Sequence, residues 1–310
     1  MREVFIGELI REKRKELKLS QADLCFGICD ISTLSRIENK HQTPTRNVLN
    51  ALLERLGVSS ERFYAAVTAE EMRINELYIE ITNDNVEYGK ATGENKEKVK
   101  RNLLRKHEEL RLIMDEDDNI SKQMLARSEV IISDWSIEEK IEKLTWAIRL
   151  TQPSFKLQDI KNGLFYFDEI KLINLMAVTY SEGGNSEKAI EIWQNLLRNC
   201  DNRFDGISGA RAEKDLILYG LAREKLIVKD YKSALQYAEE GQQLAIRFGI
   251  FLHLPGYIMI QAECEYQLGN SAKSKKIFEQ AYSLCEIIGD NSNKQLIKDG
   301  YREYFNQSLS

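Results

Sequence analysis

Residues that interrupt helices are scarce in this chain of 310 residues. It holds 3 prolines and 17 glycines, whereas average usage would give roughly 15 prolines at this length. All-β sandwiches and barrels need many turns that are rich in these two residues. Their scarcity therefore argues against such folds and predicts a mostly helical chain. No apolar run approaches the ~20 residues that span a bilayer, so we expect no transmembrane helix.

Cysteine and histidine are also few, which limits the possible chemistry. The five cysteines are scattered, and Cys25 and Cys29 have no second Cys or His pair at the spacing of a zinc site. We expect these cysteines to be small buried side chains in a reducing cytoplasm, with no metal and no cofactor. The sequence contains none of the motifs GxSxG, GxGxxG, HExxH or the phosphate-binding loop, so we expect no enzyme activity. The start, MREVFIGELIREKRK, does not resemble a secretory signal.

Charge is unevenly divided along the chain. The net charge is −5, with +2 in residues 1–66 and −7 in the remaining 244 residues. We call residues 1–66 the headpiece and residues 67–310 the array. The headpiece is the better candidate to bind a polyanion, although the margin is also compatible with an ordinary solvated surface.

The headpiece shows five short helical segments. Apolar spacing predicts helices at 3–17, 21–27, 33–40, 46–56 and 60–66. Ser20 is placed to cap the second helix and forms a capping box with Asp23, and Ser32 is a candidate cap of the third. Pro44 and Thr45 precede a leucine-rich helix that Gly57 ends. This order, with a short turn between the second and third helices, predicts a helix-turn-helix domain that binds DNA.

The array reads as long amphipathic helices that pair into repeats. We expect helices near 69–87, 94–114, 119–133, 136–150, 168–182, 186–199, 208–227, 231–248, 255–268, 271–288 and 291–306, and no strands. Ala177, Ala222 and Ala262 occupy the same repeat position, followed seven residues later by Gly184, Lys229 and Gly269 in the turn. Small residues where two antiparallel helices cross are typical of tetratricopeptide repeats. The spacings of 45 and 40 residues exceed the usual ~34, so the repeats are degenerate.

The chain as a whole resembles the Rgg/PlcR-type peptide-responsive transcription regulators. The headpiece resembles the Cro/C1-type domain through Ser20-Gln21, the run Ile28-Cys29-x-x-Ser32-x-Leu34-Ser35-Arg36-Ile37-Glu38, and Pro44-Thr45. The resemblance implies an all-α fold in which a five-helix helix-turn-helix domain (1–66) precedes a right-handed α-solenoid (67–310) capped near 291–306. It further implies a cytoplasmic homodimer, a palindromic operator in double-stranded DNA, a short signalling peptide bound by the array, and a structural ion pair between Arg14 and Glu38.

Exposed polar residues around the third helix are the candidate DNA contacts. If Leu34 and Ile37 point inward, Arg36 points outward, where arginine can donate two hydrogen bonds to guanine. Residues at the starts of the second and fourth helices suit phosphate oxygens. The predicted DNA-binding residues are Gln21, Ser32, Thr33, Ser35, Arg36, Asn39, Lys40, Thr45 and Arg46.

The concave face of the array is the candidate peptide site. Asparagine amides can pair with the backbone of an extended peptide, and arginine can hold its carboxylate. The predicted peptide-binding residues are Gln123, Arg127, Lys171, Asn174, Val178, Tyr219, Arg223, Met259, Glu263 and Tyr266. Two other functions remain open on the sequence alone. The protein could be a constitutive dimeric repressor without a peptide ligand, or an adaptor whose array binds another protein.

Overall fold

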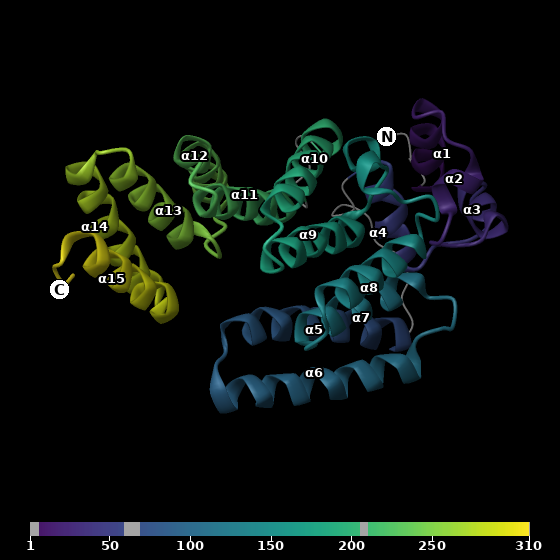
Figure 1. Ribbon diagram of the computed structural model, residues 1–310. Coiled ribbons are helices and arrows are strands. Elements are labelled where there is room, and N and C mark those ends of the chain that lie inside the picture. The colour runs from purple at the N-terminus through teal and green to yellow at the C-terminus, as the bar shows by residue number, and fades with distance from the viewer. Residues whose placement is uncertain (1–5, 59–68, 205–209, 310) are drawn as a thin grey trace. The chain divides into compact units, whose positions relative to one another are not determined.

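A computed structural model describes residues 6–58, 69–204 and 210–309 (Figure 1). All regular elements in these three ranges are helices, as the scarcity of proline and glycine predicts. The contacts of the chain group into two compact units, of which the first holds residues 1–176 and 203–207 and the second holds the rest. Within the described ranges, no helix combines the length and the apolar character needed to cross a bilayer.

The headpiece contributes four described helices: α1 (Ile6–Glu16), α2 (Gln21–Cys25), α3 (Ile31–Glu38) and α4 (Arg46–Arg55). Their apolar faces meet in one core, which includes Ile10, Leu24, Leu34, Ile37, Leu49, Leu52 and Leu53. α1 and α3 cross closely at Gly7, where an added Cβ would lie 1.9 Å from the Ile37 carbonyl oxygen. The fifth predicted helix, at 60–66, falls outside the described residues.

The caps of the headpiece helices agree with the sequence at α2 and differ at α3. The capping box of Ser20 and Asp23 is present at α2, and Thr45 caps α4. The prediction that Ser32 caps the third helix is wrong, because Asp30 has the extended N-cap backbone and the helix begins at Ile31. Asp and Ser are equally good caps, so the sequence Asp-Ile-Ser offers two starts; the helix uses the earlier one, where the Asp30 side chain forms no capping hydrogen bond.

The rest of the first unit consists of paired antiparallel helices. α5 (Ala69–Lys90) packs on α6 (Gly93–Ile113), and α7 (Asn119–Ile132) packs on α8 (Ile137–Arg149) (Figure 1). α5 also packs on α7, so successive pairs stack through their first helices. A short 3₁₀ helix, Leu157–Asn162, lies in the segment 151–166, whose apolar pattern predicts no regular element. The unit reaches Met176 within α9 (Phe167–Glu182) and also takes in the end of α10, from Arg203.

The second unit, taken by itself, also consists of paired antiparallel helices. It holds the end of α9, most of α10 (Ser186–Phe204), and the pairs α11 (Ala210–Ile227) with α12 (Tyr231–Phe248) and α13 (Leu254–Gln267) with α14 (Ser271–Ile288). The last helix, α15 (Asn291–Phe305), packs on α13 and α14. The repeat register predicted from sequence is confirmed, because Ala177, Ala222 and Ala262 are all fully buried.

The turns of the three helix pairs α9–α10, α11–α12 and α13–α14 share one geometry. Gly184, Lys229 and Gly269 all have positive φ, of 77°, 60° and 90°. In each turn, the residue after this position donates its N–H to the carbonyl five residues earlier, as Asp230 does to Lys225 at 2.9 Å. This is the Schellman helix end, which favours glycine because a side chain is strained at positive φ. Lys229 occupies a glycine position and retains that strain.

Replacing Lys229 with glycine should therefore stabilise the second unit. We expect the free energy of unfolding to rise by about 0.5–1 kcal/mol, since the relieved strain exceeds the added entropy of the unfolded chain. Gly269→Ala is the matched reverse change and should lower the free energy by a similar amount. Urea denaturation followed by circular dichroism measures both. Loss of stability in Lys229→Gly would contradict the assignment.

Candidate DNA-binding and peptide-binding sites

α3 presents a polar face opposite its buried stripe. Leu34 and Ile37 are buried, whereas Ser32 and Arg36 are exposed and Thr33 is half-buried. The Arg36 guanidinium donates to the Thr33 hydroxyl over 3.3 Å at the surface, so these two predicted DNA contacts lie side by side. Because both groups are solvated, a base edge or a phosphate can displace this bond at little cost.

The other predicted DNA contacts lie at helix ends. The Asn39 amide donates to the Ser35 carbonyl at 2.8 Å and closes the end of α3. Lys40 follows with a φ of 66° and forms a surface ion pair with Glu8 at 2.6 Å. At the start of α4, Thr45 caps the helix and Arg46 is exposed. The unpaired N–H groups of this helix start suit a phosphate oxygen.

Arg14 and Glu38 form the internal clamp of the headpiece. Arg14 donates Nε and Nη2 to the two carboxylate oxygens of Glu38 at 2.7 and 2.8 Å, and the Glu38 side chain is 2% exposed. Burial opposes the ionisation of Glu38, but hydrogen bonds from Arg14 and Gln21 outweigh it and lower the pKa of the carboxyl group. The predicted structural pair is thus present, and it holds α3 against α1.

Gln21 belongs to this clamp. Its amide donates to Glu38 Oε2 at 2.8 Å and its side chain is half-buried. Sequence reasoning assigned Gln21 to a DNA phosphate and did not foresee this bond, because the two residues are 17 positions apart. A phosphate contact by the same amide stays a prediction.

A second arginine clamp, which sequence reasoning missed, joins the headpiece to the array within the first unit. Arg55, at the end of α4, is 1% exposed and donates to the carbonyls of Leu24 and Phe26 at 3.0 and 2.9 Å. It also pairs with the buried Glu169 carboxylate at 3.2 Å. Burial raises the pKa of Glu169 despite the nearby Arg55 charge. In sequence, Arg55 looks like an ordinary basic residue in a last helical turn.

Gln123 does not line a groove, so its assignment to the peptide site is wrong. It is completely buried, and its amide donates to the Ala147 carbonyl at 2.9 Å and to the Thr151 hydroxyl at 2.7 Å. The Tyr166 hydroxyl donates to its other end. α7 packs against α5, α6 and α8, and this packing covers positions that a single helical stripe would leave exposed.

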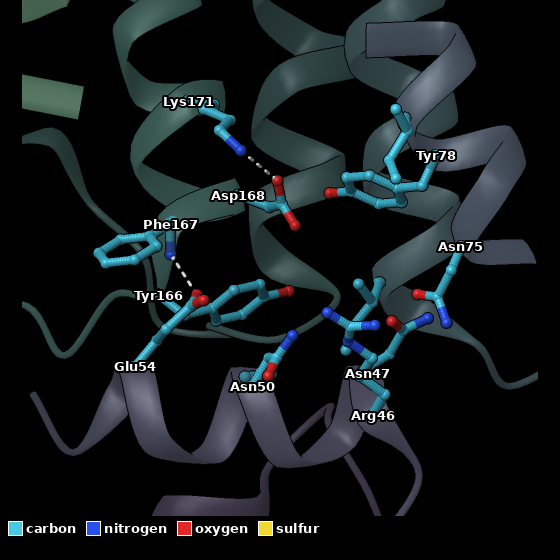
Figure 2. A pocket seen from close by; sticks show the side chains of 13 residues that line it. Arg46, Asn47, Asn50, Glu54, Asn75, Tyr78, Tyr166, Phe167, Asp168 and Lys171 are labelled. Carbon is cyan, nitrogen blue, oxygen red and sulfur yellow. Dashed lines mark hydrogen bonds and ion pairs between the residues drawn. The ribbon is translucent and has the colours of Figure 1, made fainter. Parts of the chain in front are cut away.

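Lys171 lies in a cavity of about 260 Å³ between α4 and the helices α5 and α9 (Figure 2). Its ammonium group pairs with Asp168 at 3.2 Å, and the Tyr78 hydroxyl points toward the same carboxylate. Burial disfavours the charged form of Asp168, but the Lys171 and Arg127 cations outweigh it and lower the pKa of the carboxyl group. The cavity is further lined by residues that sequence reasoning did not name, among them Asn50, Asn75, Tyr78, Ile79 and Tyr166.

The sequence of α5 could have identified two of these lining residues. Asn75 and Ile79 are four residues apart and therefore share one face of α5, on which Ile79 is exposed. Val178 and Asn174, on α9, are half-buried. Arg127 is also half-buried and donates to the Thr82 hydroxyl at 3.5 Å.

The predicted peptide contacts of the second unit differ in accessibility. Arg223 is exposed, whereas Tyr219 is half-buried and stacks on His253 with ring centroids 4.5 Å apart. Met259 packs against the hydrophobic core to which α15 contributes, and Tyr266 packs on Tyr304. Burial, reinforced by Glu303, raises the pKa of the Glu263 carboxyl group to about 7.

Residues 10–63 match a family model described as helix-turn-helix. The headpiece is a helix-turn-helix domain. The structure of PlcR from Bacillus thuringiensis in complex with the peptide PapR7 and DNA superposes with a TM-score of 0.59 at 16% identity, covering 94% of this chain and 98% of that chain. Apo ComR, a competence regulator from Streptococcus vestibularis, superposes with a TM-score of 0.51 at 17% identity, covering 97% and 98%. The chain therefore has the fold of PlcR and ComR. A search of curated proteins gave no match.

The clamp inside the helix-turn-helix domain can be tested by breaking it. Arg14→Met should lower the free energy of opening of the domain by about 3–5 kcal/mol, because it leaves the Glu38 carboxylate buried without its cation. Lys13→Met removes a neighbouring cation whose ion pair with Glu16 is on the surface, and should change the free energy by less than about 1 kcal/mol. Amide hydrogen exchange over residues 6–58 measures both variants. Equal effects of the two changes would show that the Arg14 pair does not hold the domain together.

Proposed function

We propose that this protein is a sequence-specific transcription regulator that binds duplex DNA through α3 and is controlled by a short peptide bound to the array. The observation that carries the proposal is the polar face of α3, with Ser32 and Arg36 exposed on a helix-turn-helix domain. The fold shared with PlcR, which was solved with a peptide and DNA, supports both partners. We further propose that the protein acts in the cytoplasm as a homodimer. Dimers of this domain type read two half-sites about one helical turn apart, so the expected operator is palindromic.

Within the proposed site, α3 reads bases and the helix ends hold phosphates. Ser32, Thr33, Ser35 and Arg36 face the major groove, and Arg36 is the base reader. Asn39, Lys40, Thr45, Arg46 and Gln21 position the domain on the backbone.

The surroundings of α4 supply a means of control. A cavity of about 240 Å³ is lined on the headpiece side by Thr45 and Arg46, and on the array side by Asp115, Asp117 and Asp118. A DNA phosphate that approaches the start of α4 in this arrangement meets these carboxylates, which repel it. DNA binding is thus favoured when the headpiece moves away from residues 115–118. The headpiece can thus lie close to residues 115–118 or away from them. A ligand that binds one of these two arrangements more tightly than the other changes the DNA affinity.

The DNA contacts are tested with two variants and an operator selected in vitro from random duplexes. Arg36→Ala should weaken binding by about 1–3 kcal/mol and relax the preference at one position in each half-site. Lys40→Gln should weaken binding to all sequences alike and reduce the salt slope by about 1. Footprinting and binding titrations at several salt concentrations measure these effects. A footprint of a single half-site would contradict the dimer, and an unchanged preference in Arg36→Ala would reject it as the base reader.

The peptide contacts are tested with a peptide recovered on the protein from spent culture medium and identified by mass spectrometry. Asn174→Ala and Arg223→Ala should weaken its binding about fivefold or more, because each removes a hydrogen-bonding partner, and should leave DNA binding by the free protein unchanged. Arg149→Ala removes an exposed arginine from α8 and is the control. Calorimetry gives the affinities. If no recovered peptide changes the operator affinity, the protein is a constitutive repressor.

A further inference from the structure

The cavity of Figure 2 has two walls, one from the headpiece and one from the array. Asn47 and Asn50 rise from α4 on one side, and Asn75 comes from α5 on the other. All three side chains are half-buried. Tyr166 and Phe167 also line the cavity, and the Tyr166 ring lies near Asn50.

The three asparagine side chains are available to a ligand. Within the described residues, none of the three amide groups forms a hydrogen bond, whereas Glu54, Asp168 and Lys171, three of the four charged groups of the cavity, are engaged. Asp168 pairs with Lys171, and Glu54 accepts the Phe167 N–H at 3.0 Å. The three amides are only half-buried and remain open to solvent, so a ligand that enters the cavity can form hydrogen bonds with them in place of water.

The chemistry of the cavity selects an extended peptide. An asparagine amide offers one donor group and one acceptor, which match the N–H and C=O of a peptide unit. Asn47 and Asn50 are three residues apart and therefore lie on one face of α4, opposite Asn75. The volume of about 260 Å³ lies just below the range of small-molecule pockets, so it holds a short stretch of a peptide and leaves the remainder outside.

We propose that the signalling peptide places one stretch of its backbone in this cavity, where Asn47 and Asn50 of the headpiece and Asn75 of the array bond to it together. The helix-turn-helix domain is then itself part of the peptide site. This inference rests on the proposed function and specifies where the ligand acts. A peptide held by both walls binds best when α4 lies against α5, so occupancy favours that arrangement. Because the same arrangement brings Asp115 and its neighbours to the start of α4, the peptide lowers DNA affinity.

The experiment uses the full chain and a synthetic peptide. A phage-displayed library of random heptapeptides is selected on the wild-type protein, and the strongest binder is synthesised with a fluorescein label. Fluorescence anisotropy then gives its Kd for the wild type, Asn50→Ala, Asn75→Ala and the control Asn83→Ala. Asn83 is an exposed asparagine on α5 outside the cavity.

We expect Asn50→Ala and Asn75→Ala each to raise the Kd about five- to tenfold, and Asn83→Ala to leave it unchanged. The heptapeptide should also weaken operator binding by the wild type, and do so less in the two cavity variants. Thermal melting of the three variants checks that the fold is intact.

The outcomes separate this inference from the proposed function. If the heptapeptide changes operator affinity but binds both cavity variants as it binds the wild type, the two-walled site is wrong and peptide control stands. If the heptapeptide tightens operator binding, the proposed direction is wrong. If selection yields no heptapeptide binder, both the peptide-controlled function and this site are rejected.

Discussion

The buried pair of Arg55 and Glu169 is the interaction on which the arrangement of the first unit depends. Its members are 114 positions apart, and both are almost completely removed from solvent. Two charges in such a place are stable only if each meets a partner and further hydrogen bonds. The Leu24 and Phe26 carbonyls accept hydrogen bonds from Arg55 Nη1, and the Tyr166 N–H donates to Glu169. These bonds form together only when α4 lies against the start of α9, so the pair fixes that contact.

A second arginine strengthens the same junction by donating to backbone carbonyls on both sides of it. Arg203 donates to the carbonyls of Phe165 and Arg55 at 2.8 and 2.6 Å. Arg203 thus bonds both to the end of α4 and to the segment before α9. These two segments cannot separate without losing several hydrogen bonds. The internal clamp of Arg14 and Glu38 is independent of this junction. The fold of the headpiece therefore does not depend on its contact with the array.

The cavities beside the junction owe their composition to this docking. α4 brings amides and a helix start, and the array brings carboxylates and aromatic rings. Neither surface is a site by itself, because each presents scattered polar groups that water would satisfy. Brought together, they form one cavity with unpaired amides and another in which acidic residues oppose the start of a helix. If the proposed peptide and DNA sites are correct, both lie beside this one contact between α4 and the array.

The sequence alone determined the helices, their repeat register and most of their ends, because these features depend on residues that are close together in the chain. The capping box at Ser20 and the left-handed turns at Gly184, Lys229 and Gly269 depend on neighbouring residues, so periodicity and composition predict them within a few positions. The face of α3 followed in the same way from Leu34 and Ile37. Tertiary structure alone decided the burial of Gln123, the bond of Gln21 to Glu38, and the meeting of Asn50 with Asn75. Each of these depends on elements that lie far apart in the chain, and a single helical period carries no information about which neighbour covers a face or which distant charge lies beside it.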